Sequence, residues 1–146
     1  MDANVQNMSG LELLQTMQRG ELPHPSMADT IPMQVVAVLQ GKVTFAAQAD
    51  ERHLNPAGGV HGGFAATVLD SATGCAVHSA LAAGVGYGTV DLNVKIVKAV
   101  PLNTRLLAEA NLLHLSKRLG TAEATLKDEQ GRLYAHATAT CMILGG

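Results

Sequence analysis

The chain has 146 residues, of which 47% are apolar and only 15% are charged. This composition excludes intrinsic disorder, and the length suits one domain with a buried core. Ten Lys and Arg against twelve Asp and Glu leave a net charge of -2, and the aromatic side chains number two Tyr and two Phe. A nucleic-acid-binding role is disfavoured, because such proteins need basic surfaces and aromatic side chains that stack on bases.

The composition also bears on location and assembly. The opening residues MDANVQNMSG lack the apolar core of a signal peptide, and no apolar run is long enough to span a bilayer. Cys75 and Cys141 are too few for a disulfide framework. We therefore expect a soluble, cytoplasmic protein. The richness in Ala and Gly and the low charge indicate that other copies of the chain cover part of its surface, so we expect a homo-oligomer, a dimer or a tetramer.

Residues 1–32 are expected to form a helix and a linker ahead of the main domain, which we assign to residues 33–146. Ser9 can cap a short helix from Gly10 to Arg19, because its side-chain oxygen can accept from a free backbone N–H of the first turn. Gly20 follows directly and can end this helix in a left-handed conformation.

A hairpin, a glycine-rich loop and a long helix come next. Residues 33–50 alternate in a strand-like way on both sides of Gly41, which predicts two strands joined by a turn at QGK. Residues 55–63, NPAGGVHGG, hold four glycines in nine positions. The stretch from Phe64 to Ala83 has no helix breaker and is apolar nearly all round, so we expect a buried helix there.

From Thr89 onward, apolar residues recur with a period of two in four runs, and each run predicts a strand with one buried face. Turns are expected at residues 101–103, near 118–120 and at 128–131. Six predicted antiparallel strands and one apolar helix imply an α+β fold in which the sheet wraps around the helix. The four sets are Val90, Leu92, Val94 and Ile96; Leu106, Ala108, Ala110 and Leu112; Ala122, Ala124 and Leu126; and Leu133, Ala135, Ala137, Ala139, Cys141 and Ile143.

Asp70 is the only formally charged residue between His53 and Val90, and it lies inside the predicted buried helix. A lone carboxylate in apolar surroundings is costly unless a partner or a pKa shift relieves it. Two interpretations follow. In the first, Asp70 forms a structural hydrogen bond from the helix to a loop or lies on a helical turn that faces the surface. In the second, it is a general base or a nucleophile.

The loop before the helix favours the second interpretation. A glycine-rich turn that enters a helix presents free backbone N–H groups and the positive end of the helix dipole, which can bind a developing oxyanion. Gly62 and Gly63 would let a carbonyl approach the backbone, because neither has a Cβ. Asp70 lies eight residues after Gly62, or ~12 Å along the helix axis. If both act on one carbonyl, a second copy of the chain must supply one of them.

These residues together resemble a known family. The segment N-P-A-G-G-V-H-G-G at 55–63, the acid at Asp70 and the strand T-V-D-L-N at 89–93 resemble the hotdog-fold acyl-CoA thioesterases of the phenylacetate-degradation (PaaI-like) class. The resemblance covers roughly residues 33–144. It implies an antiparallel sheet wrapped around the central helix, edge-to-edge dimers that often form tetramers, and active sites at the dimer interface.

The resemblance also implies residue roles. Gly62 matches the position whose backbone N–H polarises the thioester carbonyl, and Asp70 matches the acid of the partner subunit that activates water or attacks directly. Asn55 and His61 match positions that shape the site around the thioester, and Thr89 matches a hydroxyl that helps position the water. The remaining residues expected to contact the acyl-CoA substrate are Gly63 and Phe64 beside the reacting group and Lys117 and Arg118 near the nucleotide phosphates.

Other chemistries fit the sequence less well. Hydratases of the same fold resemble a D-x-N-P-x-H motif, but His53 and Gly58 stand where that Asp and that His belong. No metal-ligand spacing is present and the thioesterase reaction needs no cofactor. An alternative function is a non-catalytic module that binds acyl-CoA or an aromatic ligand, although such a module has no use for a buried carboxylate. The acyl group stays open between aryl and medium-chain aliphatic, and Phe64, Val68 and Leu69 are close enough in sequence to line an apolar pocket.

Overall fold

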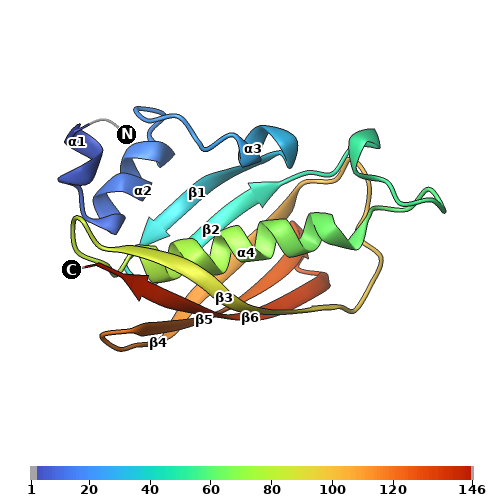
Figure 1. Cartoon of the computed structure of the whole chain (residues 1–146). Coiled ribbons are helices and arrows are strands. Elements are labelled where there is room, and N and C mark those ends of the chain that lie inside the picture. The colour runs from blue at the N-terminus through green and yellow to red at the C-terminus, as the bar shows by residue number, and fades with distance from the viewer. Residues whose placement is uncertain (1–2, 146) are drawn as a thin grey trace.

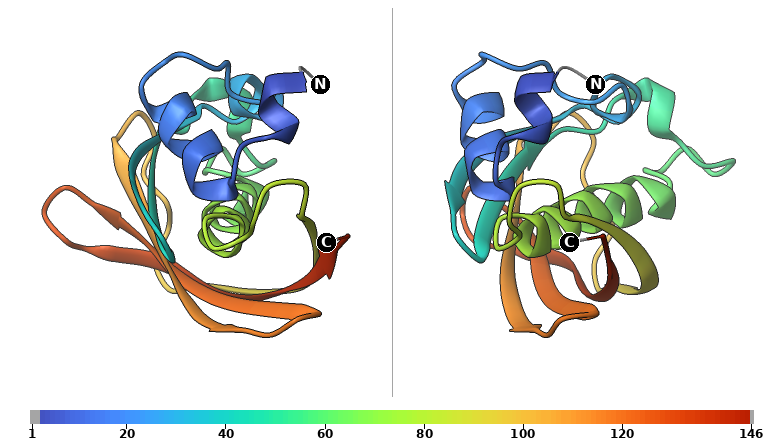
Figure 2. Two further views of the ribbon diagram at one scale, coloured as in Figure 1. Left: turned by 90° about the vertical axis from the view of Figure 1, so that its left-hand side faces the viewer. Right: turned by 60° about the vertical axis from the view of Figure 1, so that its left-hand side comes forward.

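A curved antiparallel sheet encloses a long helix. The computed structural model describes residues 3–145, and within them the strands pair antiparallel in the order β1-β2-β4-β5-β6-β3. Helix α4 lies on the concave side of the sheet, and α2 and α3 lie against β1 (Figures 1 and 2). This is the expected α+β hotdog fold, so that prediction is confirmed. The elements are α1 (Ala3–Gln6), α2 (Gly10–Gln18), α3 (Met27–Thr30), β1 (Met33–Leu39), β2 (Lys42–Ala47), α4 (Gly62–His78), β3 (Gly86–Ile96), β4 (Leu106–Leu115), β5 (Leu119–Asp128) and β6 (Leu133–Leu144).

The inner face of the sheet is lined with small side chains, as the alternation in the sequence predicts. At Gly120 the helix comes so near that a Cβ built on this residue would lie 2.7 Å from Val77 Cγ1 of α4. The alanines that share this buried face are Ala108, Ala110, Ala122, Ala124, Ala135 and Ala137. Because these residues are small, α4 can lie close to the sheet and bury Phe64, Val68 and Leu69 at 2% exposure or less. Burying each such side chain contributes ~1.5–3 kcal/mol, so the sheet side of α4 anchors the helix.

Helix α4 is shorter than predicted and begins earlier. It runs from Gly62 to His78, not from Phe64 to Ala83. It ends because the Ser79 hydroxyl donates to the Ala76 carbonyl and accepts from the Gly41 amide, both at 2.7 Å, which ties the turn to the β1–β2 hairpin. The expectation that α4 is buried all round is also wrong for the single chain, since a stripe that includes Thr67, Asp70, Ser71 and His78 is only partly covered.

Strand β3 begins at Gly86, three residues before the predicted start, and it forms an edge of the sheet. The four apolar residues expected on one face do not behave alike. Leu92 and Val94 are half-buried, whereas Val90 is 58% exposed and Ile96 is 46% exposed. An irregularity in the β3–β6 register between Thr89 and Asp91 turns Val90 outward. The turn expected near residues 118–120 is also shifted, since Leu119 and Gly120 belong to β5.

The opposite edge of the sheet is covered by the N-terminal segment. Helix α2 begins as predicted, with the Ser9 hydroxyl accepting from the Glu12 amide at 3.2 Å. Gln18 donates through Nε2 to the Val36 carbonyl at 2.8 Å, and His24 Nε2 accepts from the Val35 amide at 3.1 Å. Side chains thus occupy backbone groups of β1 that would otherwise be free to pair with another strand.

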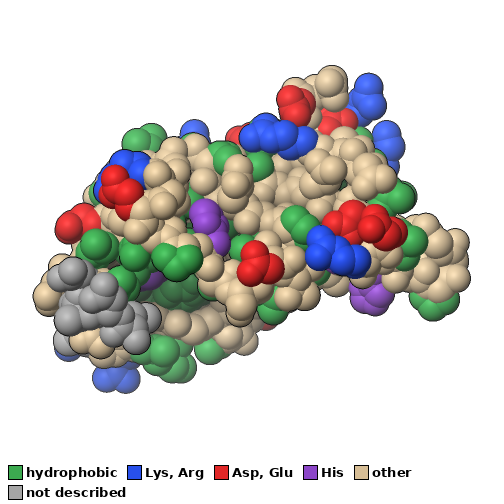
Figure 3. Space-filling model, turned by 90° about the horizontal axis from the view of Figure 1, so that it is seen from above, with side chains coloured by type: hydrophobic (Ala, Val, Ile, Leu, Met, Phe, Trp, Pro, Cys, Tyr) green, Lys and Arg blue, Asp and Glu red, His purple; other side chains and the backbone are tan. Residues whose placement is uncertain are grey.

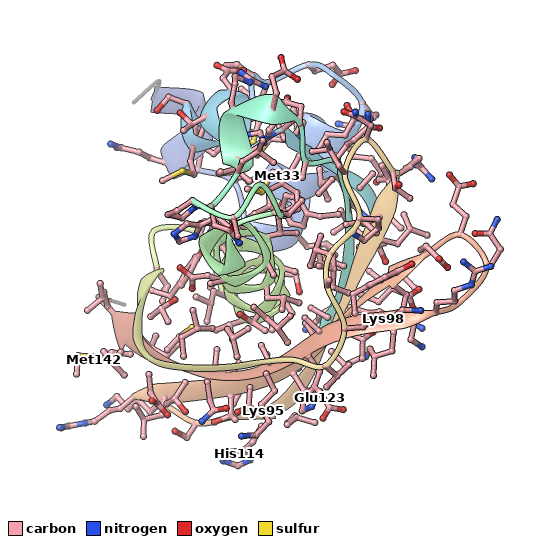
Figure 4. All side chains as sticks on the ribbon, turned by 90° about the vertical axis from the view of Figure 1, so that its right-hand side faces the viewer. Met33, Lys95, Lys98, His114, Glu123 and Met142 are labelled. Carbon is pink, nitrogen blue, oxygen red and sulfur yellow. The ribbon has the colours of Figure 1, made fainter. Side chains whose placement is uncertain are left out.

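The outer surface carries mixed charge. Acidic and basic side chains are scattered over the face shown in Figure 3 and do not gather into a patch of one sign. Lys95, His114 and Glu123 project from the outer face of the sheet, away from α4 (Figure 4). Cys75 and Cys141 are free thiols. Among residues 3–145, no helix is long and apolar enough to cross a membrane.

Substituting Gly120 by Ala should separate α4 from the sheet. The new Cβ would lie 2.7 Å from a methyl of the fully buried Val77, and overpacking of this kind costs ~1–3 kcal/mol. Urea denaturation should therefore report a lower free energy of unfolding for Gly120→Ala. Gly88→Ala is the matched control, because there the Cβ would meet Leu144 Cδ1 at an ordinary 3.7 Å. Equal stability of the two variants would contradict the close helix–sheet packing.

Candidate active site

The glycine-rich loop is held in shape by its own first residue. Asn55 Oδ1 accepts from the Ala57 and Gly59 amides at 3.0 and 3.1 Å, and the Asn55 amide donates to the Gly59 carbonyl at 2.8 Å. Gly58 has a φ of +87°, a conformation that favours glycine. Asn55, one of the predicted site residues, therefore fixes the loop that leads to α4.

His53 fastens the base of this loop to the rest of the chain. Its side chain is 4% exposed. Its Nδ1 accepts from the Asp50 amide at 2.9 Å and its Nε2 lies 2.8 Å from the Thr30 carbonyl, so both ring nitrogens have structural partners. The His53 carbonyl accepts from the His61 amide at 2.7 Å. His53 stands where hydratases carry an acid, and here it positions the loop.

The N-terminus of α4 presents one free amide. His61 is the N-cap residue, and its Nδ1 accepts from the Gly63 amide at 2.8 Å. The His61 carbonyl accepts from the Phe64 amide at 3.0 Å. In the part of the chain that the structure describes, the Gly62 N–H donates to no protein group. Because the first amides of a helix carry partial positive charge, this N–H is an available donor for an oxyanion or another anion.

Asp70 lies on the partly covered stripe of α4 and meets β3. The Thr89 hydroxyl donates to Asp70 Oδ1 at 2.9 Å, and Cys141 Sγ lies 3.8 Å from the same hydroxyl. Within residues 3–145, Asp70 forms no ion pair. Burial, assisted by the nearby Asp70 charge, raises the pKa of the Cys141 thiol, which keeps it protonated at neutral pH. Among the described residues, the carboxylate therefore has one oxygen held by a hydroxyl and no cation paired with it.

The predicted site residues fall into two groups on one chain. Gly62 and Asp70 are on the same helix, eight residues apart, or ~12 Å along its axis. Strand β3 runs beside them: a Cβ built on Gly62 would lie 3.1 Å from Ile96 Cδ1, while Thr89 reaches Asp70. The free amide and the carboxylate are therefore aligned along the α4–β3 seam but are too far apart to act on one carbonyl.

The apolar pocket expected from Phe64, Val68 and Leu69 is not formed by them. Val68 and Leu69 are fully buried against the sheet, so that expectation is wrong for these two residues in the single chain. Phe64 is 2% exposed, and its ring packs 5.5 Å from the His53 ring. It borders a cavity of about 320 Å³ at the start of α4, together with His61, Gly63 and Thr67. A Cβ at position 63 would lie 2.9 Å from His61 Nδ1, so a larger residue there would displace the His61 ring.

Lys117 and Arg118 lie at the other end of the molecule. They occupy the exposed β4–β5 turn, next to Gly120, which contacts Val77 in the last turn of α4. The single chain therefore does not bring these two cations to Gly62. The cation that borders the cavity at Gly63 is Arg52, which is already paired with Asp50 at 2.7 Å.

Sequence reasoning missed two residues that shape the site. The role of His53 could have been inferred from its spacing to Asp50, since the two form a capping box around a short 3₁₀ turn. No local sequence pattern indicates a role for Tyr87. Its ring packs on α4 at Gly74 and lies 5.2 Å from the His78 ring, a contact that depends on how β3 crosses the helix. In residues 3–145, no three His, Cys, Asp or Glu side chains gather as metal ligands.

Comparison with known families agrees with this geometry. A family model of the thioesterase superfamily matches residues 57–135, which include the end of the loop, all of α4 and most of the sheet. The chain belongs to the thioesterase superfamily. This membership supports the expectation of a thioester hydrolase. The predicted resemblance to PaaI-like proteins is also confirmed, because structures of such proteins are among those that match this superfamily chain.

Solved structures cover almost the whole of this thioesterase-superfamily chain. A phenylacetic acid degradation-related protein from Ralstonia eutropha JMP134 is 31% identical, with a TM-score of 0.80 over 88% of this chain and 98% of that one. A thioesterase family protein from Silicibacter pomeroyi is 26% identical, with a TM-score of 0.80 over 91% and 99% of the two chains. The E. coli PaaI protein has a TM-score of 0.80 over 91% and 94% at 16% identity, a likeness of fold alone.

One curated relative matches over a shorter stretch. A protein from Halobacterium salinarum, to which esterase activity has been ascribed, is 41% identical over 71 residues. The alignment covers 47% of this chain and 46% of that protein, so the chain spans about half the length of this relative.

Proposed function

We propose that the chain hydrolyses acyl-CoA thioesters at a site built from two copies of the chain. The observation that carries this proposal is the pair of groups along the α4–β3 seam: a free helix N-terminal amide at Gly62 and an unpaired carboxylate at Asp70. An acyl transfer to water needs both an oxyanion donor and a base or nucleophile. Membership of the thioesterase superfamily supports the same chemistry.

The reaction starts with the thioester carbonyl beside the Gly62 N–H. As an oxygen nucleophile adds to the carbonyl carbon, negative charge develops on the carbonyl oxygen, and the amide and the helix dipole stabilise it. The absence of a side chain at Gly62 allows this approach. When the tetrahedral intermediate collapses, the carbon–sulfur bond breaks and the thiolate of coenzyme A leaves.

Asp70 supplies the other half of the reaction in one of two ways. As a general base, it takes a proton from water while the water oxygen bonds to the carbonyl carbon, and it returns that proton to the thiolate. As a nucleophile, its carboxylate oxygen attacks, and water then hydrolyses the mixed anhydride. The Thr89 hydroxyl, 2.9 Å from Oδ1, orients the carboxylate in both routes. A single turnover in isotopically labelled water separates them.

The geometry of β3 supports a second copy as the source of Asp70. This edge carries exposed apolar residues, Val90, Ile96 and Val97, whereas the β1 edge is covered by the N-terminal segment. A two-fold axis near the middle of β3 would turn a second strand end for end. It would bring the second copy's Thr89 and Asp70 toward this chain's Ile96 and Gly62.

The same two-fold arrangement gives roles to the remaining predicted residues. The β4–β5 turn lies at the C-terminal end of α4, so in a second copy turned end for end it points toward this chain's Gly62. Lys117 and Arg118 of that copy are then placed to meet coenzyme A phosphates. Asn55 and His61 hold the loop and the helix start in position around the thioester.

Asp70→Asn should separate catalysis from folding. The amide keeps the shape of the side chain but removes its basicity, so turnover of an acyl-CoA panel should fall by at least ~10². The melting temperature should stay the same or rise, since an unpaired charge has been removed. Ser71→Ala, one residue along the same stripe, is the control and should keep wild-type turnover. A folded Asp70→Asn variant that retains more than about a tenth of the wild-type rate would rule out Asp70 as base or nucleophile.

Val90→Glu should split the proposed dimer. A carboxylate in place of this exposed apolar side chain would lose its hydration when the two β3 strands pair, so sedimentation should shift toward the 15.2 kDa chain and activity should fall with it. Leu39→Glu is the control, because Leu39 is 66% exposed on β1, at the covered edge. A wild-type chain that stays monomeric at micromolar concentration, or an active monomeric Val90→Glu variant, would remove the two-copy site.

A further inference from the structure

Tyr87 and Thr89 both reach from β3 to α4. Thr89 contacts Asp70, and Tyr87 contacts the helix one turn further along, at Gly74. The two residues are two apart on β3, before the register irregularity, so their side chains lie on the same face of the strand. Gly74 lies four residues after Asp70 and therefore on the same side of the helix. A Cβ built on Gly74 would lie 2.8 Å from Tyr87 Cε2 and 3.1 Å from the Tyr87 hydroxyl, so the ring occupies the space that a side chain at position 74 would need.

The groups around Tyr87 form an uncharged wall. The His78 ring lies 5.2 Å from the Tyr87 ring at an angle of 46°. Burial lowers the pKa of His78 and raises that of the Tyr87 hydroxyl, and it raises the pKa of the Cys75 thiol to about 12. All three side chains are therefore neutral near pH 7. A wall of this kind suits an apolar acyl group and disfavours a charged one.

Behind this wall lies a cavity of about 590 Å³. Tyr87 and His78 line part of it, and the residues that line the rest include the apolar Met8, Leu13 and Val85 and the polar Gln6 and Asn7. Helices α1 and α2 lie close to the C-terminal end of α4 at this place (Figure 1), where the Gly10 amide donates to the Leu81 carbonyl at 3.0 Å. Asp70 and Thr89 do not border the cavity. The ring of Tyr87 therefore stands between the carboxylate and this space.

We propose that Tyr87 sets the length of the acyl group by closing the far end of the acyl pocket. The proposal rests on the proposed thioesterase function. An acyl group that runs from the reacting carbon beside Asp70 along the α4–β3 seam meets the Tyr87 ring after one helical turn, or about 6 Å. That distance accommodates a benzoyl or butyryl group, whose apolar end packs against the ring. A decanoyl chain would need the cavity that Tyr87 closes off.

The test compares kcat/KM for butyryl-, benzoyl- and decanoyl-CoA in the wild type and in three variants. The wild type should prefer the butyryl or benzoyl substrate. Tyr87→Ala opens the pocket into the cavity, so the ratio of decanoyl to benzoyl kcat/KM should rise at least ~10-fold. Tyr87→Leu should shift the ratio in the same direction by less and guards against misfolding of the alanine variant. Tyr87→Phe keeps the ring and should leave the ratio unchanged.

The outcomes distinguish the two proposals. If the wild type hydrolyses no acyl-CoA, the thioesterase function fails and this inference falls with it. If the wild type hydrolyses acyl-CoA but already prefers decanoyl, the inference about Tyr87 is wrong and the thioesterase function stands. The same holds if folded Tyr87→Ala and Tyr87→Leu keep the wild-type ratio. Tyr134→Phe, which alters a tyrosine that is hydrogen-bonded to Asp128 outside the seam, is the control for general loss of packing.

Discussion

The close approach of α4 to a sheet lined with alanine and glycine is the constraint on which the rest of the structure depends. Small residues on the inner face, such as Ala122 and Gly120, let the helix bury Val68, Leu69 and Val77 almost completely. The sheet anchors that side of the helix. The stripe of α4 that includes Asp70 stays partly uncovered, and its position relative to β3 is fixed by this packing. Close packing of this kind transmits small displacements, so the positions of site residues on α4 depend on it.

The same packing places the Gly62 amide and the Asp70 carboxylate at separate points along the α4–β3 seam. Gly62 offers its amide near Ile96, and Asp70 accepts from Thr89 further along. A rigid helix cannot bring these groups closer, since its rise per residue is fixed. The proposed site, shared between two copies, would resolve this separation without any change of conformation, and the uncovered β3 edge would then be a functional surface. The covered β1 edge then limits pairing to one side of the sheet.

Much of the fold could be predicted because the apolar residues of most strands alternate with a period of two. The buried sets beginning at Leu106 and Ala122 lie on the inner face as expected, and a two-residue turn at Gly41 joins β1 and β2. The end of α4 could not be predicted, because Ser79 stops the helix through a hydrogen bond to Gly41, which is distant in sequence. The exposure of Val90 depends on a strand irregularity that period-two reasoning does not detect.

The candidate site was predictable where its residues are local. The glycine-rich loop at Asn55 and the acid at Asp70 follow from glycine content and an isolated charge, whereas α4 begins at Gly62, two residues before the predicted start. The pocket was not predictable: the periodicity of a helix that is apolar all round does not tell which side faces the sheet, so Val68 and Leu69 were assigned to the wrong surface. The contact of Tyr87 with Gly74 depends on the crossing of β3 over α4 and has no local signature.

Mixing two inactive variants tests the shared site most directly. The Asp70→Asn and Gly62→Val variants are each prepared as folded oligomers with distinct affinity tags. The two preparations are then mixed so that they exchange subunits, and the tags isolate the mixed species. In a mixed dimer, one site receives the intact Gly62 and the intact Asp70 and the other receives neither, so random exchange should restore about a quarter of the wild-type turnover. Purified mixed dimers that stay as inactive as the parent variants would contradict a site shared between two copies.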